Sequence, residues 1–150
     1  LSELCRENEV RLEKAGGVRR PILLKIAPDL SEGELDDILQ ILIDLKLDGI
    51  IATNTTMSRE GPFKDLNEAG GISGMPVCVK STEIIARIAK QTEGRLPIIG
   101  AGGISSPDTA QAKIDAGATL VQLYSGMIFE GPLLGKRIAR SLATSFGDLQ

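Results

Sequence analysis

The chain has 150 residues, of which 42% are hydrophobic and 25% charged, and its formal net charge is −3. This balance is typical of a soluble globular protein, and the slight acidity without a basic cluster argues against nucleic acid or anionic lipid as the main partner. No apolar run approaches the ~20 residues of a membrane-spanning helix, and no signal peptide opens the chain. Because Leu1 is not an initiator methionine, we expect the sequence to begin inside a longer protein.

Short apolar runs alternate with helical patterns along the whole chain. In chain order we expect a helix over 2–14, a strand over 22–26, a helix over 31–45, a strand over 49–53, a helix over 81–90, a strand over 97–101, a helix over 106–116, a strand over 119–124 and a helix over 131–145. The apolar strands without polar alternation are typical of parallel strands that are buried on both faces.

Local motifs mark several helix ends. Gly16-Gly17 is expected to stop the first helix, and Ser31 followed by Glu34 has the spacing of a capping box. The second helix carries an apolar stripe at helical spacing, made of Leu35, Ile38, Leu39, Leu42, Ile43 and Leu45. Between the second strand and the third helix lies a long, polar, glycine-rich segment from Met57 to Val79, and loops of that length are usually functional or mobile.

Four βα units in sequence predict an α/β fold with a parallel sheet and helices outside it. A complete (β/α)8 barrel needs about 250 residues, so four units form either a small open domain or half of a closed barrel.

The last two predicted strands end in small residues. Pro97–Ser105 and Thr119–Gly126 both break from an apolar run into glycine or serine, which lets backbone amides approach an anion. In (β/α)8 barrels these two strand ends commonly build a phosphate site, a feature that barrels of unrelated function share.

Other polar residues stand at the earlier strand ends. Lys25 lies inside an apolar strand, where a cation is costly unless an anion meets it; taken alone, an ion pair with Asp29 is the favoured interpretation. Thr53-Asn-Thr-Thr56 suits either a cap or turn, or recognition of a ring that bears amide groups. The stretch Gly70–Gly74 is equally consistent with a flexible turn.

No histidine is present, so chemistry here must use lysine, serine, threonine, asparagine or a cofactor. Cys5 and Cys78 fit no metal-binding spacing, and we interpret them as reduced thiols without a functional role. No metal site is predicted.

Five motifs in register resemble the dihydroorotate dehydrogenase family, and they correspond to the C-terminal half of its barrel, from about the fifth strand to the end. The similarity covers Pro21–Leu142, and its motifs are Lys25-Ile-Ala-Pro-Asp-Leu30, Ala52-Thr-Asn-Thr-Thr56, Gly70-Gly-Ile-Ser-Gly74, Pro97-Ile-Ile-Gly100 with Gly102-Gly-Ile104, and Val121-Gln-Leu-Tyr-Ser125. The second and fifth motifs look like the quinone-linked, membrane-associated branch, class 2.

The resemblance implies roles for ten residues. Lys25 matches the lysine beside the flavin of the cofactor FMN, and Thr53 matches a flavin contact. Asn54 and Thr55 match residues that bind the pyrimidine ring of dihydroorotate or orotate. The remaining matches are the loop that covers FMN, at Ser73 and Gly74, and the cradle of its phosphate, at Gly102, Gly103, Tyr124 and Ser125.

The implied reaction is the oxidation of (S)-dihydroorotate to orotate in pyrimidine biosynthesis, with a quinone as electron acceptor. The catalytic base of the class 2 enzymes is a serine on a loop that would precede Leu1, so no residue of this chain is assigned that role. Residues 1–150 would then be half of one FMN-binding barrel domain, inactive without the other half. The family also implies peripheral association with an inner membrane, through an N-terminal segment absent here.

Two other interpretations stay open from the sequence. One is another barrel oxidoreductase that binds FMN or phosphate, and the other is a non-catalytic half-barrel that serves as a binding module.

Overall fold

The computed structural model describes residues 1–15 and 20–147. Its elements are α1 (Ser2–Ala15), β1 (Leu23–Ile26), α2 (Glu32–Asp44), β2 (Gly49–Ala52), the 3-10 turns η1 (Gly61–Phe63) and η2 (Met75–Val77), α3 (Cys78–Gln91), β3 (Ile98–Ala101), α4 (Pro107–Asp115), β4 (Leu120–Gln122), α5 (Ser125–Glu130) and α6 (Leu134–Gly147). The expected helix stop at Gly16-Gly17 lies outside the described residues. Among the described residues, no helix is both long and apolar enough to cross a lipid bilayer.

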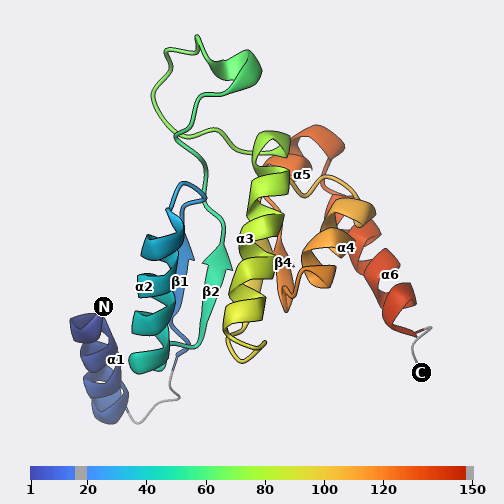
Figure 1. Ribbon diagram of the computed structural model, residues 1–150. Helices are drawn as coiled ribbons and strands as arrows, with labels where there is room; N and C mark the ends of the chain where they lie inside the picture. The colour runs from blue at the N-terminus through green and yellow to red at the C-terminus, as the bar shows by residue number, and fades with distance from the viewer. Residues whose placement is uncertain (16–19, 148–150) are drawn as a thin grey trace.

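The four strands form one parallel sheet in the order β1-β2-β3-β4. Each strand therefore pairs with the next one along the chain, and the intervening helices supply the crossovers, which confirms the predicted βα units. Figure 1 shows β1 and β2 pointing toward the end of the molecule from which the segment after β2 rises. The carboxyl ends of all four strands consequently meet at that one edge.

The two faces of the sheet differ in burial. The row of paired residues Leu24, Ile50 and Ile98 packs beneath the helices, where Ile50 and Ile98 are 0% and 1% exposed. The neighbouring row runs from Lys25 through Ile51 and Ile99 to Leu120 on the opposite face, and Leu120 is 60% exposed. The expectation of burial on both faces was wrong for β4, because the second layer that would cover this row is not formed by the described residues.

The core lies between the sheet and its helices in two clusters. The larger contains Leu35, Leu39 and Leu42 of α2, and the smaller joins α4 and α6 through Ala110, Leu134 and Ile138. The predicted capping box is confirmed: the amide of Glu34 donates to Ser31 Oγ at 3.3 Å, and the amide of Ser31 donates to the Glu34 carboxylate at 2.8 Å.

Some predicted boundaries were wrong. Ile43 is 46% exposed, because a helix turns by about 100° per residue and so carries Ile43 away from the buried direction of Leu42. Helix α3 begins at Cys78 rather than at 81, and α6 begins at Leu134 rather than at 131. The six-residue helix α5 was not predicted, since it is too short to show a hydrophobic period.

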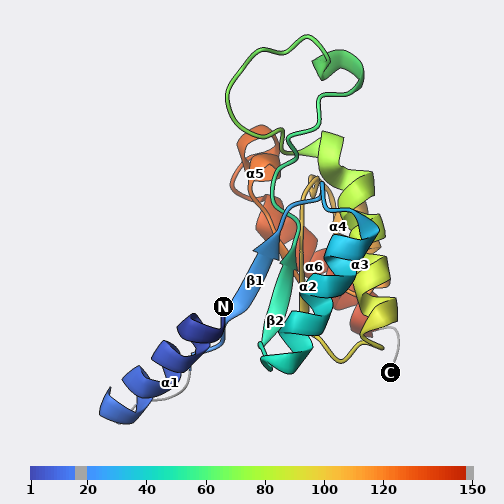
Figure 2. The same ribbon diagram turned by 60° about the vertical axis from the view of Figure 1, so that its left-hand side comes forward.

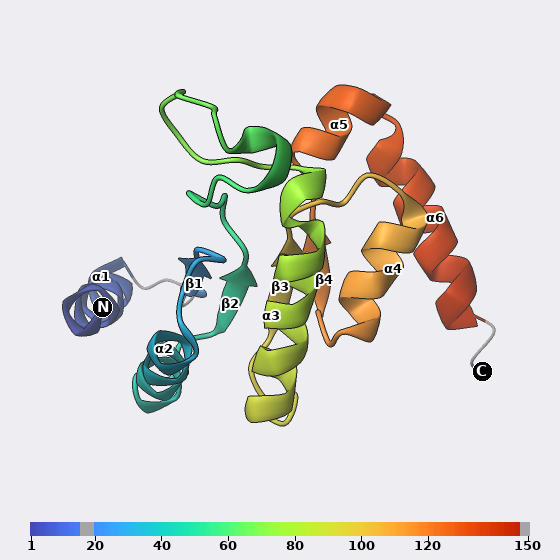
Figure 3. The ribbon, with the colours of Figure 1, turned by 45° about the horizontal axis from the view of Figure 1, so that its top comes forward.

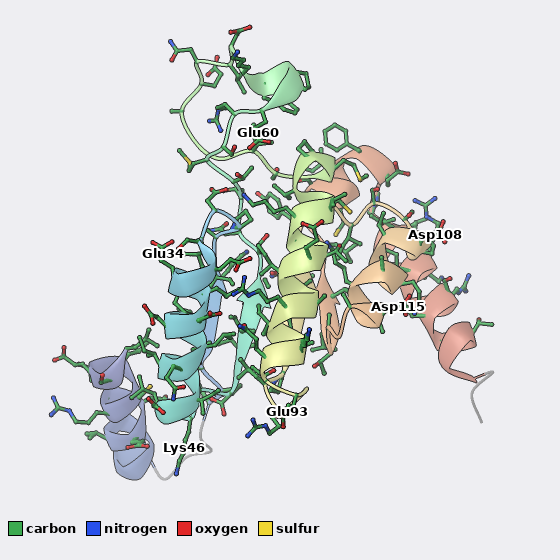
Figure 4. The ribbon with its side chains drawn as sticks, in the orientation of Figure 1. Glu34, Lys46, Glu60, Glu93, Asp108 and Asp115 are labelled. Carbon is green, nitrogen blue, oxygen red and sulfur yellow. The ribbon has the colours of Figure 1, made fainter. Side chains whose placement is uncertain are left out.

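The segment between β2 and α3 arches above the carboxyl edge of the sheet (Figure 2). Its base is joined by an antiparallel bridge between Thr56 and Ile72. Inside it, the guanidinium of Arg59 donates to the carbonyl of Gly70 at 2.5 Å and to that of Glu68 at 3.3 Å. Figure 4 labels Glu60 on this segment and labels Lys46 and Glu93 at the opposite end of the molecule.

Candidate functional site

A pocket of about 270 Å³ lies at the carboxyl edge of the sheet. Seen partly from above, this edge lies between the long segment that follows β2 and helix α5 (Figure 3). The pocket brings together all ten residues singled out in the sequence: Lys25, Thr53, Asn54, Thr55, Ser73, Gly74, Gly102, Gly103, Tyr124 and Ser125. They come from five separate stretches of the chain, and the parallel sheet gathers them because its strands all end at the same edge.

Lys25 is exposed on the face of β1 that the helices do not cover, and it lines the pocket. The favoured ion pair with Asp29 is wrong, since within residues 1–15 and 20–147 the ammonium of Lys25 has no carboxylate within salt-bridge distance. The cation therefore remains available to a negatively charged or electron-rich group in the pocket.

Asp29 instead secures the segment that follows β2. Its carboxylate accepts hydrogen bonds from Thr56 Oγ1 at 2.5 Å, from the amide of Met57 at 2.7 Å and from the ammonium of Lys80 at 3.4 Å. Partial burial acts to raise the pKa of Asp29, but the bonds from Thr56, Met57 and Lys80 outweigh it and hold the pKa below its usual value.

The backbone of Thr53 and Asn54 is fastened to the flanking strands. The amide of Thr53 donates to Ala101 O at 2.8 Å, and that of Asn54 donates to Ile26 O at 2.7 Å. Thr53 Oγ1 is buried and has no hydrogen-bond partner among the described residues, which is rare for a buried polar atom. The turn interpretation of this motif holds for Thr56, whose hydroxyl oxygen accepts a hydrogen bond from the amide of Ser58 at 3.0 Å.

The loop residues reach the far side of the pocket. Ser73 Oγ and Ser125 Oγ lie 2.7 Å apart, so the segment after β2 contacts the turn that follows β4. Gly74, the next residue, has a φ of +78° and a position close to the Ser125 side chain. The loop thus borders the pocket rather than standing free in solvent.

Two glycine-containing turns, one after β3 and one after β4, line the same part of the pocket. Gly103 has a φ of +75°, and a Cβ built on it would collide with Cys78. A Cβ on Gly126 would collide with the carbonyl oxygen of Ile104. The backbone amides of Gly103 and Ser125 have no acceptor in the part of the chain that the structure describes. Close-packed backbone with unused amides is the arrangement that binds a phosphate group.

Several lining residues were not singled out in the sequence: Val77, Ala101, Ile104, Gln122, Leu123 and Gly126. Gln122 pairs with Ala101 in the register of β3 and β4, and strand alternation from Leu120 would have placed it on the open face. Tyr124 is 80% exposed, so its ring is not part of the core. In the described residues, no group of three or more histidine, cysteine, aspartate or glutamate side chains lies where it could hold a metal ion.

Comparison with known proteins gives consistent results. A family model described as dihydroorotate dehydrogenase matches residues 2–146. A dihydroorotate dehydrogenase (quinone) from Rhizobium meliloti is 53% identical over 142 residues, which are 93% of this chain and 38% of the relative. An enzyme of the same name from Haemophilus ducreyi is 46% identical over 144 residues, 95% of this chain and 43% of the relative.

Among solved structures, the ligand-free crystal structure of DHODH from Eimeria tenella superposes with a TM-score of 0.79 at 36% identity, covering 87% of this chain and 37% of the other. Structures of this kind are (β/α)8 barrels, and the four βα units described above form a part of such a barrel. The chain spans about two fifths of the length of the curated relatives that it matches. By sequence and by fold, the chain belongs to the dihydroorotate dehydrogenase family.

Proposed function

We propose that this chain forms the C-terminal half of an FMN-dependent enzyme that oxidises (S)-dihydroorotate to orotate in pyrimidine biosynthesis, with a quinone as acceptor. The observation that carries the proposal is the convergence of ten residues from five motifs on one pocket. When bound, FMN would supply hydride acceptance from the substrate and electron transfer to the quinone.

The residues present fit FMN. The phosphate would bind at Gly102, Gly103, Tyr124 and Ser125, where the amides of Gly103 and Ser125 have no acceptor among the described residues. The unsatisfied hydroxyl of Thr53 suits a polar atom of the flavin ring. The ammonium of Lys25 would stabilise the negative charge on the flavin when it accepts a hydride.

Asn54 and Thr55 would orient the substrate. The carboxamide of Asn54 offers both a donor and an acceptor, and Asn54 is an exposed residue that lines the pocket. A pyrimidine ring presents N–H and C=O groups on one edge, so a site of this kind rejects rings that lack them. Gly71 permits this arrangement, because a side chain there would collide with the hydroxyl of Thr55.

The catalytic base and the membrane contact are proposed to lie outside residues 1–150, in the half of the barrel that precedes this sequence. Two features support a missing half: β1 and β4 each have one partner strand in the described sheet, and the row from Lys25 to Leu120 is uncovered. Unpaired strand edges and an open apolar face favour association with a complementary segment.

The test uses a complete barrel, in which residues 1–150 follow the N-terminal part of the Rhizobium meliloti relative. We expect this complete barrel to hold FMN, and to bleach the flavin spectrum when dihydroorotate is added and restore it when a quinone follows. Residues 1–150 alone should show no turnover with FMN, dihydroorotate and a reducible dye. A complete barrel that binds FMN but does not respond to dihydroorotate would refute the proposed reaction and favour a binding module.

A further inference from the structure

Lys113 of α4 is a fully buried lysine, with 0% of its surface exposed. Helix α4, whose two ends are labelled by Asp108 and Asp115 in Figure 4, packs beside α3. The side chain of Lys113 starts close to β3, because a Cβ added to Gly100 would lie only 3.1 Å from the Cβ of Lys113. Lysine is almost never buried without a compensating partner, so the site calls for an explanation.

The ammonium of Lys113 donates to three acceptors at the start of α3. They are the carbonyl oxygen of Cys78 at 2.7 Å, Thr82 Oγ1 at 2.6 Å and Ser81 Oγ. None is a carboxylate. An ammonium group has three N–H bonds, and here each one has an acceptor.

The two hydroxyl groups also act as hydrogen-bond donors. Ser81 Oγ donates to the carbonyl oxygen of Gly102 at 3.2 Å, and Thr82 Oγ1 donates to that of Cys78 at 2.9 Å. Since a hydroxyl has a single proton, its lone pairs are left to accept from Lys113. Ser81 Oγ also lies 3.4 Å from the carbonyl oxygen of Cys78, so the shorter contact at 3.2 Å favours donation to Gly102. The favoured chain of hydrogen bonds therefore runs from Lys113 through Ser81 to Gly102.

This chain of bonds determines how the Gly102–Gly103 peptide is turned. The C=O and N–H of one trans peptide unit point in opposite directions. With the carbonyl of Gly102 held back toward Ser81, the amide of Gly103 is directed to the other side of the peptide, and both glycines line the pocket.

We infer that Lys113 is a positioning residue for the phosphate of the cofactor: through Ser81 it orients the Gly102–Gly103 turn, and its charge favours a phosphate monoester bound there. This inference rests on the proposed FMN site. Burial lowers the pKa of Lys113, and an anion on the far side of the turn opposes that effect by favouring the ammonium form.

A purely structural role, in which Lys113 only joins α3 to α4, makes a different prediction. Loss of such a role would weaken every ligand of the pocket together. Loss of a phosphate-positioning role would weaken FMN and spare riboflavin, which has the same ring system without the phosphate. The ratio of the two affinities therefore separates the alternatives.

The experiment measures the dissociation constants of FMN and riboflavin for the complete barrel by quenching of flavin fluorescence. For Lys113→Met we expect FMN affinity to fall by about tenfold or more, with riboflavin affinity within about twofold of the unmodified protein. Ser81→Ala, which breaks the link to Gly102, should reproduce this change in the ratio. Thr82→Val is the matched control, because it removes one acceptor of Lys113 and leaves the Ser81 link intact.

Equal losses of FMN and riboflavin affinity in Lys113→Met, or an unchanged ratio, would overturn the inference and leave the proposed function standing. If Lys113→Met does not fold by circular dichroism, the ratio for Ser81→Ala decides in the same way. An unmodified complete barrel that fails to bind FMN would overturn the proposed function itself.

Discussion

Replacing Gly103 with alanine tests whether the phosphate turn is as tightly packed as the structure indicates. The change has two costs. A non-glycine residue at a φ of +75° costs about 1–2 kcal/mol, and forcing a methyl group against Cys78 adds about 1–3 kcal/mol. The free energy of unfolding should therefore fall by about 2–5 kcal/mol, a large part of the roughly 5–15 kcal/mol that stabilises a typical domain.

Gly94→Ala is the control, since Gly94 has a φ of +69° and nothing within 4 Å of the added Cβ. It should lose only the conformational cost of about 1–2 kcal/mol, and the effect of alanine on the unfolded chain is common to both variants. The assay is urea unfolding of the complete barrel, followed by circular dichroism, with FMN affinity measured in parallel. Equal destabilisation of the two variants, or full FMN affinity in Gly103→Ala, would refute the reasoning.

Three further predictions concern Lys25, Asn54 and Asp29. Lys25→Met should lower the rate of flavin reduction by dihydroorotate by about a hundredfold or more while FMN stays bound, as measured by stopped flow. The control Lys90→Met, on the exposed part of α3, should leave that rate unchanged. Asn54→Leu should weaken orotate binding by about tenfold or more without changing FMN affinity, measured by orotate-dependent shifts of the flavin spectrum; equal weakening of both ligands would contradict the role of Asn54. Hydrogen bonds hold the pKa of Asp29 below the usual value, so ionised Asp29 stabilises the fold at neutral pH. This contribution declines as the pH falls below the usual carboxyl pKa, and it is lost once the pH falls below the lowered pKa of Asp29. Acid unfolding of Asp29→Asn should show a smaller change in stability over that interval than the unmodified protein; identical pH profiles would contradict it.

The sequence was sufficient for the features that depend on neighbours in the chain. The capping box at Ser31 and the four apolar strands follow from local patterns, and the rule that parallel strands share one carboxyl edge then predicts which residues meet. The resemblance to a known family added roles for those residues that no local pattern supplies.

Features that depend on distant partners were not accessible in the same way. Asp29 looked like the partner of Lys25, yet its carboxylate is taken by groups 27 and 28 positions further along the chain. Lys113 lies in the helix predicted over 106–116, and its acceptors lie 31–35 residues earlier, so nothing nearby marks it as buried. Leu120 is as apolar as a core residue, yet it is exposed because no described residue covers that face of the sheet.

The contact between Ser73 and Ser125 has a consequence for access to the pocket. Two neutral hydroxyl groups make a bond whose net worth is about 0.5–1.5 kcal/mol, so that bond alone favours the joined arrangement by only about 2- to 13-fold. The pair can separate through thermal motion, while the Thr56–Ile72 bridge keeps the base of the segment in place. Opening the pocket on this side thus costs one weak bond of the protein, and the strands and their helices stay undisturbed.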